Sequence, residues 1–382
     1  MISRTVFVVA FALTLLAGNT ATAGAAPVLP RPSSVYAVGT TALHLTDANR
    51  PDPFVPERSR ELMVSVFYPA TDAERYPQAH YVSSALIPDL EKRFGVSLPG
   101  VLTNAHTGAP AHPSGTYPVV FYSPGAGVSR IWANGLAEDL ASRGYVVVTM
   151  DHTYESPAVE FPGGRIVQHV PFPAFDQEVR QRYLAARLAD MRFVLDSVAQ
   201  LASGRNPDTG QRALPAGLDR ALDLEHIGAV GHSLGGYLAV ESMHGDRRID
   251  AAVDLDGQLG IDAEFGRSVT EGSDRPVLVL TSAQAEAVGD ANPSLNAFWQ
   301  RGTGWRRHLT MRDSAHYDYT DMPLLVPDVA RPAASTYIGP IAGARAYDLT
   351  RTYVAAMFDR FLRDRPADIL DRPADPEFTV LR

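Results

Sequence analysis

The amino-acid sequence predicts an α/β protein with a single doubly wound, mostly parallel sheet flanked by helices. From Tyr117 onward, short apolar runs alternate with segments of helical spacing, which is typical of βαβ units and parallel strands. One apolar run, at residues 227–232, leads through a glycine-flanked serine into a helical segment. With 382 residues, of which 45% are hydrophobic, the chain can bury a large core around one sheet.

The first 23 residues have the pattern of a secretory signal peptide. Arg4 supplies a positive start, residues 6–16 an apolar stretch, and Ala21-Thr22-Ala23 a small-residue cleavage site. The alternative is an uncleaved membrane anchor, but the apolar stretch is shorter than the roughly 20 residues that span a bilayer. We therefore expect a secreted protein, cleaved near Ala23 to Ala25, with no stable membrane span.

The next part of the chain is irregular before the alternating pattern begins. Residues 24–58 are rich in Ala, Pro and Ser and are expected to form an N-terminal extension, followed by the main domain at 59–382. Residues 61–69 alternate apolar and polar side chains and stop at a proline, so they predict an antiparallel strand. Residues 70–114 contain one candidate helix, at 84–94, and we expect an insertion or a rim over the sheet.

The remainder supplies the parallel strands and their helices in order. The predicted strands are residues 117–122, 145–150, 227–232, 251–255, 276–281 and 307–311. The predicted helices are residues 130–143, 176–202, 234–243 and 353–362. The helix at 176–202 has the strongest signal, because its Leu, Met and Val side chains recur on one face. Ligands of such a sheet bind at the carboxyl ends of its strands, so the site is expected there.

The composition excludes several kinds of site and partner. The chain has no cysteine, so it has neither a disulfide nor a cysteine nucleophile. Its formal net charge is -9 at pH 7 and its Lys and Arg residues form no cluster, so nucleic acid is not an expected partner. No acidic loop carries a full set of metal ligands, so neither a metal nor another cofactor is expected.

The strongest chemical motif surrounds Ser233. The residues Gly231-His232-Ser233-Leu234-Gly235 match the pattern G-x-S-x-G and lie between a predicted strand and a predicted helix, as this motif requires. The turn is so tight that side chains beside the serine would collide, which explains the flanking glycines. The serine hydroxyl is left exposed above the sheet, so Ser233 is the predicted nucleophile.

A serine hydroxyl needs a general base, and a third group must orient that base. Three histidines follow Ser233 in the chain, namely His244, His308 and His316. His244 lies in the turn that ends the next helix and His308 opens a predicted strand, whereas His316 lies in the loop after the last parallel strand. The chain order serine, acid, histidine is typical of this motif, so His316 is the predicted base.

Three aspartates lie at strand ends between the nucleophile and the base: Asp254, Asp256 and Asp290. Asp254 and Asp256 should point to the same side if the strand runs regularly through both, so periodicity alone does not separate them. Position favours Asp256, because it lies at the extreme end of the strand and Gly257 after it permits a bend toward the histidine. Asp256 is the predicted acid.

The glycine-rich loop at residues 123–127 follows a strand, so its backbone can face a substrate. We expect the N–H groups of Ala126 and Leu234 to form an oxyanion hole, with Gly125 lining the pocket. The alternative is an ordinary turn into a helix. His152 and Glu155 follow another strand and are further candidates for the pocket, against the alternative that they bond the backbone at the strand end.

A resemblance to a known family rests on six short segments. They are Val64-Ser65-Val66-Phe67-Tyr68-Pro69, Ser123-Pro124-Gly125-Ala126-Gly127, Asp151-His152, Gly231-His232-Ser233-Leu234-Gly235-Gly236, Leu255-Asp256-Gly257 and His316. Over roughly residues 60–365 the chain resembles the secreted platelet-activating factor acetylhydrolase (isoform II) family and its bacterial esterase and lipase relatives. The resemblance implies an α/β-hydrolase fold, metal-free cleavage of short or oxidised acyl chains from phospholipids, and Asp256 rather than Asp290 as the acid.

These observations predict a serine carboxylic ester hydrolase that works through an acyl-enzyme. Its expected substrates are short-chain esters of small molecules or lipids, with phospholipid sn-2 acyl groups and polyesters among the candidates. Two alternatives stay open: an exported binding protein without activity on the same scaffold, and a serine peptidase of the same fold. The sequence does not predict the oligomeric state.

Overall fold

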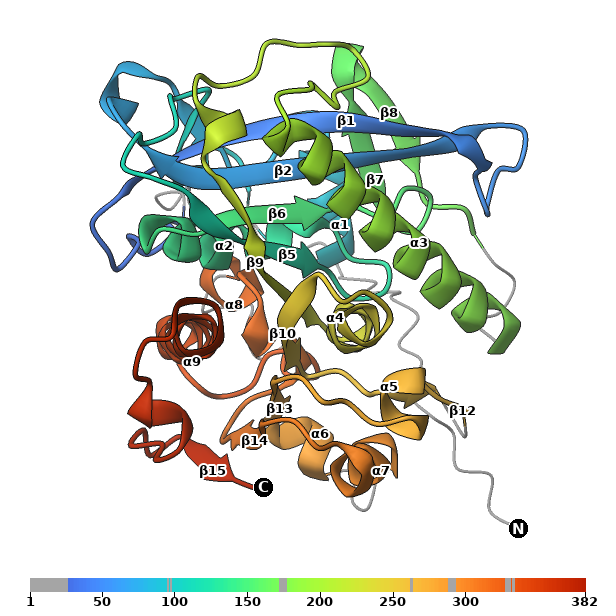
Figure 1. Cartoon of the computed structure of the whole chain (residues 1–382), viewed down its shortest axis with the longest axis vertical. Helices are drawn as coiled ribbons and strands as arrows, with labels where there is room; N and C mark the ends of the chain where they lie inside the picture. The colour runs from blue at the N-terminus through green and yellow to red at the C-terminus, as the bar shows by residue number, and fades with distance from the viewer. Residues whose placement is uncertain are drawn as a thin grey trace, which may run out of the picture.

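The computed structural model describes residues 27–94, 96, 98–171, 177–261, 264–287, 293–326, 331 and 334–382. The predicted signal peptide and its cleavage site, as well as Asp290, lie outside the described residues. In the described part of the chain, an 11-stranded sheet has the strand order β15-β14-β13-β10-β9-β5-β6-β2-β1-β4-β3. Figure 1 shows this sheet running through the centre of the molecule, with helices on both of its faces.

Six neighbouring strands in the middle of the sheet are parallel. They are β5 (Tyr117–Ser123), β6 (Val146–Met150), β9 (Leu222–His232), β10 (Ile249–Leu255), β13 (Val277–Ser282) and β14 (Arg306–Met311). Their side chains are almost all buried, as expected for parallel strands covered by helices on both faces. The α/β-hydrolase fold, with a doubly wound, mostly parallel sheet, is therefore confirmed.

Two hydrophobic cores lie on opposite faces of the sheet. On one face, α2 (Asn134–Ser142) and α9 (Gly343–Arg363) pack together over the strands. On the other face, α3 (Gln177–Ala202) and α4 (Leu234–Gly245) do the same. The closing helix α9 begins ten residues before the predicted helix at 353–362, because charged residues interrupt the apolar spacing of its first turns. Shorter elements are α5 (Arg267–Thr270), α6 (Ala283–Ala287), α7 (Pro293–Arg301), β7 (Ala158–Phe161), β8 (Arg165–Gln168), β11 (Gly260–Ile261) and β12 (Glu264–Phe265).

Antiparallel strands complete the sheet at both of its edges. The predicted early strand is present as β2 (Ser59–Ala70), antiparallel to β6. The sequence pattern does not predict β1 (Ala37–Pro51), which pairs with β2 and brings part of the expected N-terminal extension into the sheet. Small residues weaken its strand signal, yet Gly39 is required where it is, because a Cβ there would collide with the ring of Tyr68. At the other edge, β15 (Phe378–Val380) pairs with β14.

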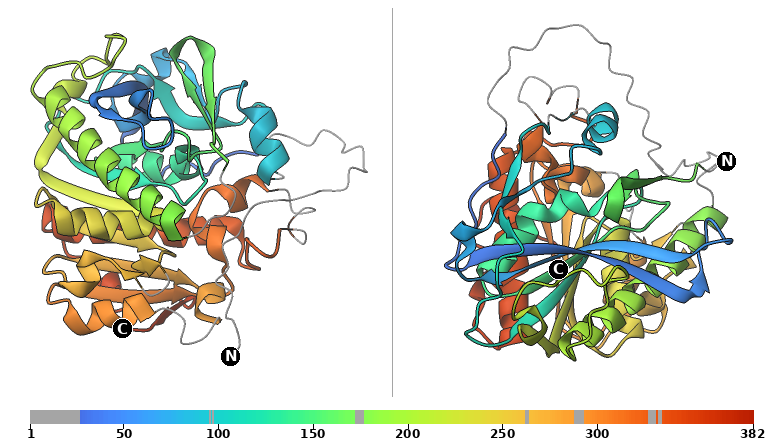
Figure 2. Two further views of the ribbon diagram at one scale, coloured as in Figure 1. Left: turned by 90° about the vertical axis from the view of Figure 1, so that its right-hand side faces the viewer. Right: turned by 90° about the horizontal axis from the view of Figure 1, so that it is seen from above.

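Residues 70–114 extend the sheet edge and also reach back toward its centre. They include η1 (Ala73–Arg75), β3 (Gln78–His80), α1 (Ile87–Phe94) and β4 (Leu102–Thr107), so the helix predicted at 84–94 is present. Leu90 and Phe94 of α1 pack with Val128, Trp132 and Tyr317 in one apolar cluster, which we call the rim cluster. This cluster also includes residues of α8 (Met322–Leu325), and Figure 2 shows α1 beside that helix.

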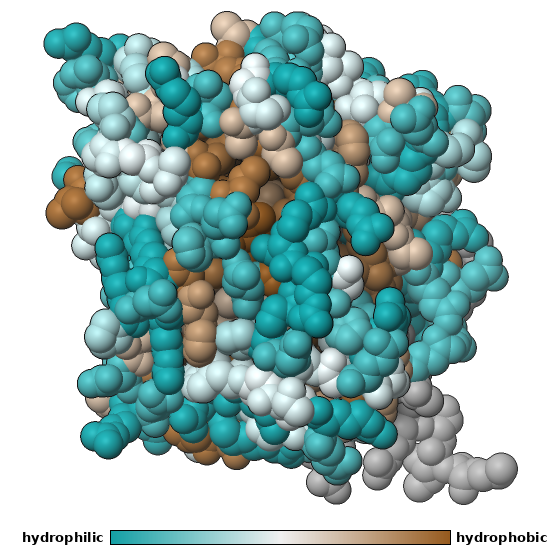
Figure 3. Space-filling view, viewed as in Figure 1, coloured by the Kyte–Doolittle hydropathy of each residue, from teal (hydrophilic) through white to brown (hydrophobic). Residues whose placement is uncertain are grey.

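The surface is largely polar. On the face drawn in Figure 3, hydrophilic side chains predominate and hydrophobic ones are visible in smaller areas between them. Across the described ranges, no helix combines the length and the apolar character that crossing a membrane requires.

Candidate active site

The predicted site residues meet at the carboxyl ends of the parallel strands. Ser233 follows β9, Asp256 follows β10 and His316 begins η5 (His316–Tyr319), a short turn after β14. Ala126 lies in the loop after β5, beside the end of β9. This is the edge of an open α/β sheet at which ligands bind.

Ser233 occupies a sharp turn between β9 and α4. Its backbone angles, φ of 57° and ψ of -124°, lie in a region that residues other than glycine rarely adopt. The Ser233 N–H donates to the Leu255 carbonyl at 2.8 Å, which holds the turn against β10. A Cβ at Gly231 would come within 2.8 Å of the Ser123 carbonyl oxygen, and one at Gly235 would lie 2.7 Å from the Pro124 carbonyl oxygen. The two glycines are therefore a steric requirement of the turn.

The His316 and Asp256 side chains form a direct hydrogen bond. His316 Nδ1 lies 2.7 Å from Asp256 Oδ2, and the two side chains are 34% and 2% exposed respectively. Asp256 also accepts the Ser282 N–H at 2.6 Å and the Ser282 hydroxyl at 2.9 Å. Burial alone would raise the pKa of Asp256, but the bond and charge of His316 and the N–H of Ser282 hold that pKa below its ordinary value. An ionised Asp256 leaves the proton of the histidine on Nδ1 and directs Nε2 away from the carboxylate.

His232, immediately before the nucleophile, ties the histidine loop to the serine turn. Its Nε2–H donates to the His316 carbonyl at 2.7 Å, and the two imidazole rings are 4.5 Å apart between centroids. Burial, followed by the nearby charge of His316, lowers the pKa of His232 to about 3, so its ring stays neutral. His316 is thus held against His232, the residue that precedes Ser233 in the chain.

Asp254 and Asp256 have different partners, although the regular pleat would place them on one side. The strand β10 ends at Leu255, and Asp256 has a φ of 57°, so the alternation stops between the two carboxylates. Asp254 is fully buried beneath the serine turn and accepts the Gly257 N–H at 2.9 Å. Burial raises the pKa of Asp254 to about 8, which keeps this carboxyl protonated at neutral pH. Of these two, it is Asp256 that contacts the histidine.

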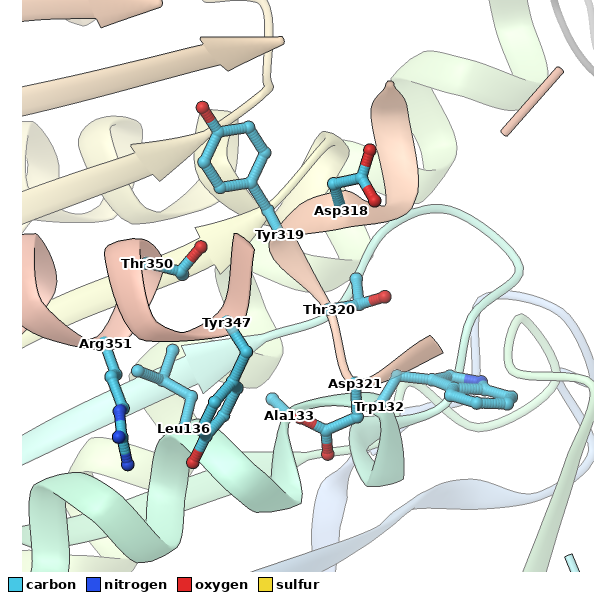
Figure 4. A pocket seen from close by; sticks show the side chains of 10 residues that line it. All are labelled: Trp132, Ala133, Leu136, Asp318, Tyr319, Thr320, Asp321, Tyr347, Thr350 and Arg351. Atoms are coloured by element: carbon cyan, nitrogen blue, oxygen red, sulfur yellow. The ribbon is translucent and has the colours of Figure 1, made fainter. Parts of the chain in front are cut away.

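The loop after His316 is anchored from behind by two buried carboxyl groups. Asp318 accepts the N–H groups of Ala315 and Gly339, both at 2.7 Å. Asp321 accepts the Gly135 N–H at 2.9 Å and the Tyr81 hydroxyl at 3.1 Å. Both aspartates line a small cavity of about 10 Å³, drawn in Figure 4, which has room for about one water molecule. This cavity lies behind the histidine loop and is too small to hold an ester.

The glycine-rich loop lies directly against the nucleophile. A Cβ at Gly125 would be 3.1 Å from the Ser233 Cβ and 3.2 Å from His232 Nδ1, so glycine permits this close approach. Gly127 has a φ of 63° and turns the chain toward α2. Leu234 opens α4, so its N–H has no acceptor within the helix. The predicted oxyanion residues Ala126 and Leu234 therefore flank Ser233 from two elements.

His152 and Glu155 lie beneath this loop, completely buried. His152 bridges two groups: its Nε2 is 2.9 Å from the Ser123 hydroxyl and its Nδ1 is 2.9 Å from Asp190 Oδ2. Glu155 forms an ion pair with Arg187. Both side chains thus contact the underside of the oxyanion loop or its supports, and neither is open to solvent.

Arg187 and Asp190 are parts of the site that the sequence pattern did not identify. Both lie on the buried face of α3 and are 1% and 0% exposed. They recur among the apolar residues Leu184, Leu188 and Met191, so two charges on an apolar helix face were the available signal. Within the described ranges, no group of three or more His, Cys, Asp or Glu side chains is arranged to hold a metal ion.

Comparison with known proteins places these residues in an esterase context. A family model described as "Platelet-activating factor acetylhydrolase, isoform II" matches residues 52–358. A "Probable 1-alkyl-2-acetylglycerophosphocholine esterase" from Arthroderma benhamiae is 24% identical over 93% of this chain and 94% of its own length. The platelet-activating factor acetylhydrolase of Cavia porcellus is 21% identical over 87% of this chain and 78% of its own. A solved ferulic acid esterase from Streptomyces cinnamoneus superposes with a TM-score of 0.80 and 38% identity, covering 94% of this chain and all of that one.

Proposed function

The chain belongs to the platelet-activating factor acetylhydrolase isoform II family and is a carboxylic ester hydrolase, and from this premise we propose that it works through an acyl-enzyme on Ser233. The observation that carries the proposal is the 2.7 Å bond between His316 Nδ1 and Asp256, formed beside a serine on a strained strand-to-helix turn. A histidine fixed in this way presents Nε2 as a base, which is what a serine nucleophile needs.

In the proposed reaction, the Ser233 hydroxyl attacks the ester carbonyl while His316 takes its proton. The N–H groups of Ala126 and Leu234 hold the negative oxygen of the tetrahedral intermediate. His316 then gives the proton to the leaving alcohol, and an acyl group stays on the serine. A water molecule, deprotonated by the same histidine, releases the acid and restores the enzyme. Asp256 stabilises the imidazolium in both halves of the reaction.

We propose esters of small acyl groups as the substrates. Two kinds of relative support this class by their names: the esterase of 2-acetylated glycerophosphocholines and the ferulic acid esterase. The second shares 38% of its residues with this chain over nearly the whole length, so hydroxycinnamoyl esters join acetyl esters in the test. The signal-like first 23 residues further support export of the enzyme from the cell.

A substrate panel tests this proposal. It comprises p-nitrophenyl esters from acetate to palmitate, methyl ferulate, and a phospholipid with an acetyl second chain, each assayed with the wild type and with Ser233→Ala. We expect acetate or ferulate to have the highest kcat/KM, and a burst of p-nitrophenol whose size equals the enzyme concentration. A preference for palmitate with activation at an oil-water interface would contradict the small-acyl class. Absence of the burst, together with an active Ser233→Ala variant, would contradict the acyl-enzyme on Ser233.

A further inference from the structure

Arg187 donates three hydrogen bonds to the glycine-rich loop that carries the proposed oxyanion donor. Its Nη1 donates to the Pro124 carbonyl at 2.6 Å and to the Ser123 hydroxyl at 3.2 Å. Its Nη2 donates to the Gly125 carbonyl at 2.9 Å. The remaining N–H groups, on Nε and Nη2, bind the Glu155 carboxylate. All five donors of the guanidinium thus have acceptors, and three of these acceptors belong to one short loop segment.

The bonds from Arg187 to the Pro124 and Gly125 carbonyls, which we call the clamp, also set the direction of the proposed oxyanion donor, because a peptide unit is planar. A trans peptide is planar, and its C=O and N–H point in opposite directions. The Gly125 carbonyl and the Ala126 N–H belong to the same peptide unit. Because Arg187 binds that carbonyl from the side of α3, the Ala126 N–H points away from α3. The Pro124 carbonyl, also bound by Arg187, fixes the Gly125 N–H in the same way.

The ion pair beneath the loop makes this clamp rigid. Arg187 and Glu155 are 1% and 0% exposed, so neither charge can exchange its partner for water. A second buried chain supports the same loop from Ser123, through His152, to Asp190. Arg60 in turn binds Asp190 at 2.6 Å and is itself fully buried. Preorganised donors in a dry site need no reorganisation when charge develops on the substrate oxygen.

We propose that Arg187 is a positioning residue that aims the Ala126 N–H at the oxyanion of the tetrahedral intermediate. The inference rests on the proposed function, because Ala126 is an oxyanion donor only if Ser233 is the nucleophile. Arg187 does not contact the substrate. It acts through the two carbonyl groups that it holds, so its removal should weaken binding of the tetrahedral state more than binding of the ester.

The test compares two variants at Arg187 with a variant of another arginine, which binds backbone carbonyl groups away from the site. Arg187→Lys keeps the charge but cannot reach two carbonyls and Glu155 together. The double variant Arg187→Met with Glu155→Gln removes both buried charges, so it leaves no unpaired ion to unfold the protein. Arg275→Lys is the matched control, because Arg275 Nη1 also binds two backbone carbonyls, those of Asp246 and Ile249. Arg275 precedes β13, so it lies at the amino ends of the parallel strands, whereas the site lies at their carboxyl ends.

The readouts separate the ground state from the tetrahedral state. For both Arg187 variants, we expect kcat per titrated active site to fall by about 10–10²-fold, with KM within about threefold. The affinity for phenylboronic acid, which forms a tetrahedral adduct with the serine, should fall in parallel. Arg275→Lys should leave both quantities within about twofold. If the Arg187 variants keep wild-type kcat and boronate affinity per active site, the inference is wrong, whereas an active Ser233→Ala would instead overturn the proposed function.

Discussion

Two series of side chains, each made of one serine, one histidine and one aspartate, lie within the described part of this molecule. We call them the first and the second chain. In the first, His316 bonds Asp256 at 2.7 Å beside Ser233. In the second, His152 bonds Asp190 at 2.9 Å and also the Ser123 hydroxyl at 2.9 Å. The two are alike in residue type, and in both the histidine bonds the aspartate. The second is the more complete in hydrogen bonds, because its histidine also bonds its serine.

Exposure and the partners of the serine separate the two chains. The His316 side chain is 34% exposed, whereas that of His152 is 1% exposed and Ser123 is fully buried. The Ser123 oxygen also accepts an N–H of Arg187, which draws electron density from it and reduces its nucleophilicity. Asp190 is bonded to Arg60 and Arg50, and the charges and bonds of Arg60 and His152, against the effect of burial, keep its pKa well below the ordinary value. We infer that the same three side chains can carry out chemistry where they are open to solvent, and that they stiffen the structure where they are buried.

The sharpest test of this contrast replaces each serine by alanine. Ser233→Ala should lower kcat by on the order of 10⁶ and abolish labelling by a fluorophosphonate, because no other hydroxyl can form the acyl-enzyme. Ser123→Ala should keep the labelling and a kcat within about tenfold, since its oxygen is out of reach of substrate. Active-site titration and intact mass spectrometry measure both. Labelling of the Ser233→Ala variant at Ser123 would show that the second chain is open after all.

The two aspartates should also differ, in kind as well as in size. Asp256→Asn should lower kcat by about 10⁴ with little change in KM, because an amide can hold the wrong tautomer of His316. Asp190→Asn should lower the free energy of unfolding by at most about 3–5 kcal/mol, because Arg60 then keeps only Asp52 as a buried carboxylate partner. Its kcat per folded enzyme should stay within about tenfold. Kinetics and chemical denaturation separate these effects, and Asp290→Asn, outside the described residues, is expected to change kcat by less than about tenfold.

A third aspartate, Asp254, gives a pH-dependent difference in stability. Its pKa in the folded protein is about 8, above its ordinary value, so the folded state keeps a proton that the unfolded chain releases. This contribution is complete at acidic pH and is lost as the pH rises through about 8. Asp254→Asn keeps an acceptor for the Gly257 N–H but does not titrate, so its Tm should fall less than that of the wild type between pH 5 and pH 9. Equal falls in Tm in calorimetry would show that Asp254 is ionised throughout.

The smallest expected effect concerns the support of the open chain. Ser282→Ala removes the hydroxyl bond to Asp256 but keeps the backbone N–H at 2.6 Å. We expect kcat to fall by about threefold to tenfold, in line with the loss of one hydrogen bond to a charged group. The Tm should change little. A fall in kcat as large as that of Asp256→Asn would mean that the hydroxyl, rather than the N–H, fixes the carboxylate.

The sequence predicts the parts of the fold that depend on local periodicity. The parallel strands and the helix α3 have strong apolar patterns, and each is found within a few residues of the predicted range. The strand β1 has a weaker pattern, in part because Gly39 is required by its contact with Tyr68, which lies opposite it on β2. Local propensity cannot reveal a residue that only a tertiary contact requires.

The candidate site divides in the same way. Ser233 and His316 lie in positions that the motif and the chain order indicate, so they could be named from the sequence. The preference for Asp256 over Asp254 was a matter of position, because the pleat rule assumes a regular strand and cannot anticipate the φ of 57° at Asp256. The sequence does not single out Arg187, because this residue lies among the apolar residues of α3, whose spacing predicts an ordinary packing helix.

Part of the rim cluster comes from one stretch of the chain that could be exchanged as a unit. One continuous stretch, residues 78–107, contributes β3, α1 and β4, and it joins the sheet only at the outer edge, where β4 pairs with β1. Its apolar residues touch the loops that carry the oxyanion donor and the base, yet it contains none of the proposed catalytic groups. A chimera that takes this stretch from the ferulic acid esterase but keeps Tyr81, whose hydroxyl binds Asp321 behind the histidine loop, would therefore change the packing beside these loops and leave the proposed catalytic groups in place.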